Sequence, residues 1–135
     1  MNIAIIAQDS KKELMIQFCI AYCGILAKHK ICATATTGKM VADATGLKIE
    51  RVQPGTMGGW EQIASRIEYN QIDLVLLFRD PMVKYDGETT LNNVMRSCDN
   101  NSIPIATNVA TAEVLIQGLR RGDFDWRDIV NPKKH

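Results

Sequence analysis

The chain has 135 residues, of which 46% are hydrophobic and 23% charged, and its net charge is close to +1. This length fits one domain, residues 1–135, with a core large enough for helices on both sides of a small sheet. Lysine and arginine are scattered along the chain, which argues against a nucleic-acid partner. The first apolar run is too short for a signal or membrane segment.

The cysteines follow no paired C-x-x-C spacing; they are Cys19, Cys23, Cys32 and Cys98. We interpret them as reduced, mostly buried thiols and expect a cytoplasmic protein. Because the only histidines are His29 and His135, we expect neither a metal site nor a metal cofactor, and nothing in the chain predicts another cofactor.

Residues 3–7 form a continuous apolar run, typical of a strand that is covered on both faces. Apolar residues at helical spacing then predict one helix from the polar residues 8–10 to Leu26. Lys11 and Lys12 fall in its first turn, where the helix dipole disfavours a cation. A ligand would explain one of these lysines, and a solvated side chain is the alternative.

Residues 31–36 read as the second strand, followed by a helix that ends at Gly46. Thr34, Thr36 and Thr37 therefore lie where a strand turns into a helix, and the first N–H groups of a helix lack intrahelical partners. Such a turn can bind a phosphate. The alternative is that Thr36 or Thr37 only caps its own helix.

A short third strand at 48–52 leads into the glycine-rich residues 53–59 and a helix with Ile63 and Ile67 on one face. The glycines would let the backbone approach a bound group, although a flexible surface loop has the same composition. Residues 73–78 and 103–108 read as two more strands and residues 90–98 and 110–119 as two helices. The apolar residues of the tail predict that it packs on the body or on another subunit; they are Phe124, Trp126, Ile129 and Val130.

Five strands alternating with helices predict a parallel sheet. The polar clusters at residues 8–12, 34–37, 54–59 and 79–81 all lie where a strand gives way to a helix. In a parallel sheet these positions meet at the carboxyl edge, where open α/β sheets bind ligands. The sequence therefore predicts one phosphate-binding site built from all four clusters.

These residues resemble the methylglyoxal synthase family over nearly the whole chain. The motifs that carry the resemblance are ATATTG at 33–38, GTMGG at 55–59, FRDP at 78–81 and IPIATNVATA at 103–112. The resemblance implies a three-layer α/β/α sandwich with a five-stranded parallel sheet of order 3-2-1-4-5. It also implies a homohexamer that binds a phosphorylated small molecule such as dihydroxyacetone phosphate, in methylglyoxal biosynthesis.

By the same resemblance, the counterparts of Lys12 and Gly55 and of the three threonines hold the phosphate. Ala35 and Pro54 stand where the family usually has glycine and serine, and Gln8 stands where it has a histidine. The expected substrate-binding residues are Gln8, Lys12, Thr34, Ala35, Thr36, Thr37, Pro54, Gly55 and Trp60.

The family reaction is a lyase reaction in which a carboxylate base removes a proton and phosphate is then eliminated. The family's aspartate after the Gly-Gly pair is Trp60 here, and its later histidine and aspartate correspond to Gly87 and Thr90. A tryptophan cannot take up the proton, so a base would have to come from elsewhere; the candidates are Glu61, Asp9 and Asp80. Two hypotheses stay open, an enzyme with a substituted base and a regulatory module that senses a phosphorylated metabolite or nucleotide.

Overall fold

The computed structural model describes residues 1–82 and 88–132. Five parallel strands form one sheet in the order β3-β2-β1-β4-β5, which confirms the expected strand order. The strands are β1 (Asn2–Ala7), β2 (Lys30–Thr34), β3 (Ile49–Val52), β4 (Leu74–Phe78) and β5 (Ile105–Ala106).

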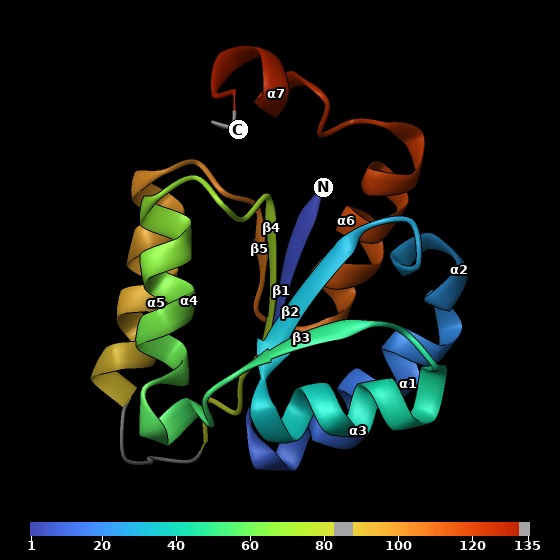
Figure 1. Ribbon diagram of the computed structural model, residues 1–135, viewed down its shortest axis with the longest axis vertical. Helices are drawn as coiled ribbons and strands as arrows, with labels where there is room; N and C mark the ends of the chain where they lie inside the picture. The colour runs from blue at the N-terminus through green and yellow to red at the C-terminus, as the bar shows by residue number, and fades with distance from the viewer. Residues whose placement is uncertain (83–87, 133–135) are drawn as a thin grey trace.

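Helices cover both faces of the sheet, so the expected three-layer α/β/α sandwich is confirmed (Figure 1). Helices α4 (Gly59–Glu68) and α5 (Glu88–Asn100) lie together on one face. The other face carries α1 (Lys12–Ala21), α3 (Ala35–Thr45) and α6 (Val109–Arg121). Short helices complete the described chain: η1 (Asp9–Lys11), α2 (Cys23–Leu26), η2 (Gly55–Met57) and α7 (Trp126–Val130). Among the described residues, no helix is both long and apolar enough to cross a membrane.

Alternating side chains of β1 serve two separate cores. Ile3 and Ile5 pack toward α1, α3 and α6, whereas Ala4 and Ile6 pack toward α4 and α5. All four are at most 1% exposed. The continuous apolar run in the sequence follows from this arrangement, because a central strand of a parallel sheet has no solvent face.

Two expected element boundaries were wrong. The helix predicted to reach Leu26 is broken at Tyr22, whose φ of −111° and ψ of 22° interrupt the helical path between α1 and α2. The second strand ends at Thr34 rather than at residue 36. Thr34 is an extended helix N-cap, and the helix begins directly with the small residue Ala35.

The last strand is also shorter than predicted, two residues instead of six. Pro104 has no N–H to donate to a neighbouring strand, so only its carbonyl takes part, accepting from the Val75 N–H at 3.0 Å. The glycine-rich segment at residues 53–59 forms a turn that leads into α4. The turn forms η2, and Gly59 is buried at the start of α4.

The tail is anchored by two side chains and leaves others in solvent. Phe124 is 6% exposed within the core beneath α6. Arg127, which the sequence gave no reason to single out, is 2% exposed and donates to Asp73 Oδ1 at 3.3 Å and to the Ser102 carbonyl at 2.9 Å. Ile129 is 82% exposed, so this part of the tail does not pack on the body. That it packs on another subunit, the other expectation, stays a prediction.

Candidate functional site

A cavity of about 380 Å³ opens at the carboxyl edge of the sheet. Each of the four polar clusters that the sequence places at strand ends contributes to its wall. The lining residues are Ala7, Gln8, Asp9, Ser10, Lys12, Thr34, Thr36, Pro54, Gly55, Thr56, Trp60 and Asp80. The tertiary structure thus brings together in one cavity residues that are up to 73 positions apart, from Ala7 to Asp80.

Lys12 is the central cation of this cavity. Its side chain is 16% exposed, and its ammonium donates to the Ala7 carbonyl at 2.7 Å and to Thr37 Oγ1 at 3.2 Å. An ion pair of 3.3 Å joins it to the exposed carboxylate of Asp9. These contacts tie the first residue of α1 to the first turn of α3, so the positive charge has a fixed position.

The N-terminus of α3 lies beside this lysine. Thr34 is the extended N-cap residue of α3, with φ −61° and ψ 150°, and its side chain makes no capping hydrogen bond. The first four N–H groups of a helix have no intrahelical acceptor, and the helix dipole favours an anion there. Thr36 is exposed on the cavity wall, while Thr37 is buried and accepts from Lys12. This arrangement is suited to binding a phosphate group.

The wall opposite α3 consists of the glycine turn and Trp60. A Cβ atom on Gly55 would come within 2.4 Å of the Trp60 Nε1 atom, so the indole lies directly against the Gly55 backbone. A Cβ atom on Gly59 would come within 2.1 Å of the Gln53 carbonyl oxygen. Both positions therefore require glycine, and Trp60, 7% exposed, forms a flat wall of the cavity.

The three candidate bases have different surroundings. Asp9 and Asp80 line the cavity, whereas Glu61 lies outside the set of described residues that line it. Glu61 Oε1 accepts from the Thr90 hydroxyl at 3.3 Å, which directs this carboxylate toward α5.

The Asp80 carboxylate is fixed by its neighbours. It accepts from the Ser10 hydroxyl at 2.7 Å and from the Met82 N–H at 2.9 Å. These two hydrogen bonds hold the pKa of Asp80 below its usual value, and the bond from Ser10 has the larger effect. The Asp80 N–H in turn donates to the side-chain oxygen of Gln8. Gln8 thus joins the ends of β1 and β4 at the cavity wall.

Some of the residues predicted from the sequence do not line the cavity. Ala35 opens α3 and Thr37 supports Lys12, and both stand behind the lining residues. Gly87 lies outside the described residues. Ser10 and Thr56 also line the cavity. They belong to the predicted polar clusters at residues 8–12 and 54–59, although neither was named as a substrate-binding residue. Within 1–82 and 88–132, no group of three His, Cys, Asp or Glu side chains is placed to hold a metal ion.

Comparisons with known proteins agree with this fold. The model of the MGS-like domain family matches residues 15–107. The methylglyoxal synthase of Caldicellulosiruptor saccharolyticus is 56% identical over 133 residues, 98% of this chain and 94% of that protein. That of Oceanobacillus iheyensis is 47% identical over 134 residues, 99% of this chain and 96% of that protein. The crystal structure of methylglyoxal synthase from Elizabethkingia anophelis matches with a TM-score of 0.81 and 35% identity, over 85% of this chain and 76% of that one. The chain belongs to the methylglyoxal synthase family.

Proposed function

We propose that the cavity at the carboxyl edge binds a phosphorylated small molecule such as dihydroxyacetone phosphate. The observation that carries this proposal is the position of the Lys12 ammonium, held by Thr37 beside the N-terminus of α3. The phosphate would lie against Lys12, the hydroxyls of Thr34 and Thr36, and the backbone of Gly55. A fixed cation and a helix N-terminus together form an anion site.

We further propose that elimination of phosphate to methylglyoxal is slow in this protein. Relatives of the chain are methylglyoxal synthases, and the family base has Trp60 in its place. Asp9 and Asp80 are the carboxylates of the cavity wall. The lowered pKa of Asp80 keeps it ionised but makes it a weak base, and Asp9 is ion-paired with Lys12.

The second candidate is a regulatory module that binds a phosphorylated metabolite or nucleotide without converting it. The position of Trp60 favours this function, because its indole forms a flat wall against Gly55. An aromatic face can stack on a base or a sugar. A nucleotide that binds more tightly than dihydroxyacetone phosphate would support the module over the enzyme.

Calorimetry with inorganic phosphate, dihydroxyacetone phosphate and nucleoside monophosphates tests the binding proposal. Lys12→Ala and Thr37→Val each remove a polar group from the anion site and should weaken binding by roughly 1–3 kcal/mol. Lys39→Ala and Thr111→Val are matched controls on exposed positions of α3 and α6. Unchanged affinity in both Lys12→Ala and Thr37→Val would rule out this site.

A direct assay of methylglyoxal formation tests the chemical step. Wild type should be slow, Trp60→Asp should gain activity, and Glu61→Gln should match wild type because Glu61 faces Thr90. Asp9→Asn and Asp80→Asn identify which lining carboxylate supports any residual rate. Robust turnover in wild type that disappears in Glu61→Gln would contradict both the slow reaction and the assignment of the base.

By resemblance to the family we also propose a cytoplasmic homohexamer. All four cysteines are free thiols, and burial raises the pKa of Cys19 and that of Cys98 to about 12, so both stay protonated and unreactive. Light scattering after size exclusion should give six times the chain mass. A monomer would contradict the proposed assembly without affecting the binding proposal.

A further inference from the structure

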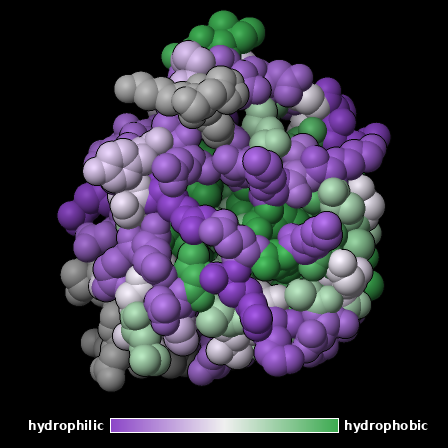
Figure 2. Space-filling view, viewed as in Figure 1, coloured by the Kyte–Doolittle hydropathy of each residue, from purple (hydrophilic) through white to green (hydrophobic). Residues whose placement is uncertain are grey.

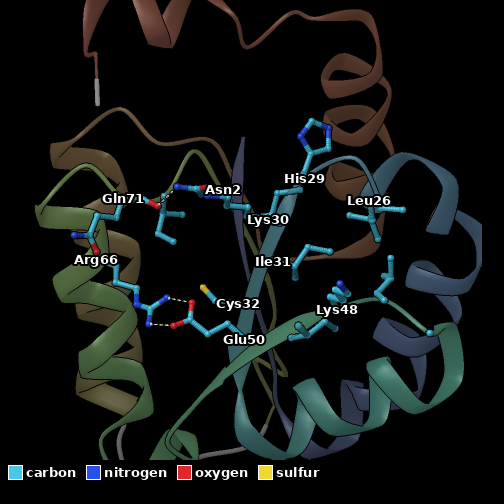
Figure 3. Close-up of a pocket in the computed structure, with 16 residues that line it drawn as sticks. Asn2, Leu26, His29, Lys30, Ile31, Cys32, Lys48, Glu50, Arg66 and Gln71 are labelled. Carbon is cyan, nitrogen blue, oxygen red and sulfur yellow. Dashed lines mark hydrogen bonds and ion pairs between the residues drawn. The ribbon is translucent and has the colours of Figure 1, made fainter. Parts of the chain in front are cut away.

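A second and larger cavity lies at the amino edge of the sheet, beside the first residues of β1, β2 and β3. Its volume is about 830 Å³. Its walls come from the start of β1, the turn after α2, the turn after α3, and the C-terminal part of α4 (Figure 3). Among the described residues, this cavity shares no lining residue with the cavity at the carboxyl edge.

The floor of this cavity is apolar. Ile31 of β2 and Leu47 in the turn before β3, 5% and 9% exposed, face the same side of the sheet. Cys32, 4% exposed, lies on the opposite face of β2. Leu26 and Ile72 close the deeper walls. In the space-filling view the same face has a hydrophobic hollow, green, ringed by hydrophilic side chains in purple (Figure 2).

The rim is positively charged. Lys30 and Lys48 are exposed lining residues, and Arg66 lies on the α4 side (Figure 3). Glu50 is the carboxylate of the lining, and both of its oxygens accept from Arg66 at 2.8 Å. The charges of Glu50 and Arg66 therefore cancel, and a ligand would meet the positive charges of Lys30 and Lys48.

From this combination we propose that the cavity binds a small anionic amphiphile, a monocarboxylate with an alkyl body. The alkyl body would lie on Ile31 and Leu47, which face the same side of the sheet, because burial of apolar surface is favourable in proportion to its area. The carboxylate would meet Lys30 and Lys48, where charge-assisted hydrogen bonds form. A purely polar anion gains nothing from the floor, and a neutral apolar molecule gains nothing from the rim.

Calorimetry with octanoate and decanoate, below the concentrations at which they form micelles, is the first test. If the alkyl chain is buried, the two added methylenes should tighten binding by up to about fifteen-fold. Decanol should bind more weakly than decanoate because it lacks the charge. Equal affinity for the two acids, or equal affinity for decanol and decanoate, would overturn the proposal.

Variants localise the site. Lys30→Gln/Lys48→Gln should weaken decanoate binding at least five-fold, while the matched double variant Lys28→Gln/Lys39→Gln should bind like wild type. Ile49→Glu places a like charge at the edge of the floor and should weaken decanoate binding further; a circular dichroism melt checks its folding. An unchanged affinity in both Lys30→Gln/Lys48→Gln and folded Ile49→Glu would refute this location.

Two measurements test whether decanoate binds separately from the cavity at the carboxyl edge. Neither the Lys12→Ala substitution nor saturating inorganic phosphate should change the affinity for decanoate. Competition by phosphate would contradict a separate site. Sedimentation with phosphatidylglycerol vesicles distinguishes a free ligand from a lipid surface: binding to vesicles without binding to decanoate would overturn the proposal. A third result would also overturn the proposal: wild type does not bind decanoate, and Lys30→Gln/Lys48→Gln changes the oligomer mass. A second copy of the chain would then cover the cavity.

Discussion

The two ends of the sheet carry positive charge in different ways. At the carboxyl edge, helix N-termini supply backbone N–H groups, and Lys12, whose side chain is 16% exposed, adds one cation beside the start of α3. At the amino edge, helices end, as α3 does at Gly46, and present carbonyls. Positive charge there must come from long side chains such as Lys30 and Lys48. The direction of the helices in a parallel fold therefore makes one end suited to small phosphates and leaves the other to side-chain chemistry.

The largest expected effect is a loss of stability from a substitution at the amino edge that leaves binding at the carboxyl edge unchanged. Arg127→Met leaves the 1%-exposed Asp73 without its guanidinium partner and should lower the free energy of unfolding by about 3–5 kcal/mol. Phosphate affinity of the folded protein should stay within about two-fold of wild type. Urea denaturation with calorimetry measures both, and Arg120→Met on the exposed face of α6 is the control. A loss below 1 kcal/mol would show that Arg127 does not anchor the tail.

Gly59→Ala should affect both stability and binding at the carboxyl end. The added Cβ would meet the Gln53 carbonyl oxygen at 2.1 Å, so the glycine turn must shift. We expect a loss of about 1–3 kcal/mol of stability together with weaker phosphate binding, because Gly55 moves with the turn. Gly24→Ala, where an added Cβ meets nothing within 4 Å, is the matched control. Wild-type affinity in Gly59→Ala would show that this turn does not form the phosphate site.

A smaller effect sharpens the account of the amino-edge cavity. Glu50→Gln removes the carboxylate that occupies Arg66. Since the pair is partly exposed, stability should fall by no more than about 1 kcal/mol, while decanoate should bind a few-fold more tightly because the rim gains a free cation. Calorimetry checks the affinity and thermal melting the stability. Weaker binding of decanoate would show that Arg66 needs Glu50 to hold its position.

The smallest effect is a pH dependence at the amino end. Burial, the nearby N-terminal ammonium and Lys28 hold the pKa of His29 below its usual value of 6.5. The folded state therefore binds this proton less readily than the unfolded state, and His29 should reduce stability as the pH falls below about 6.5. His29→Gln should flatten the melting temperature between pH 7 and pH 5 relative to wild type. An unchanged pH profile would exclude His29 as the source.

The sequence by itself determined the sheet and the edge at which the polar clusters meet. The apolar runs at residues 3–7 and 74–78 indicate strands covered on both faces, and a parallel sheet is the arrangement that covers them. Once the strands are parallel, every strand-to-helix turn falls at the same edge. The predicted polar clusters therefore met in one cavity without any knowledge of side-chain packing.

Only the tertiary structure decided which side chains of these clusters line the cavity. Lys11 and Lys12 are adjacent in sequence, and the approach of α3 to α1 places Lys12 on Thr37. Glu61 follows Trp60 directly, yet its helical position turns it to Thr90 and away from the cavity. The amino-edge cavity left no pattern in the sequence, because its walls come from chain turns and strand starts between Asn2 and Ile72. Local periodicity fixes which face of an element is buried, but side chains from distant segments meet only when those faces are packed together.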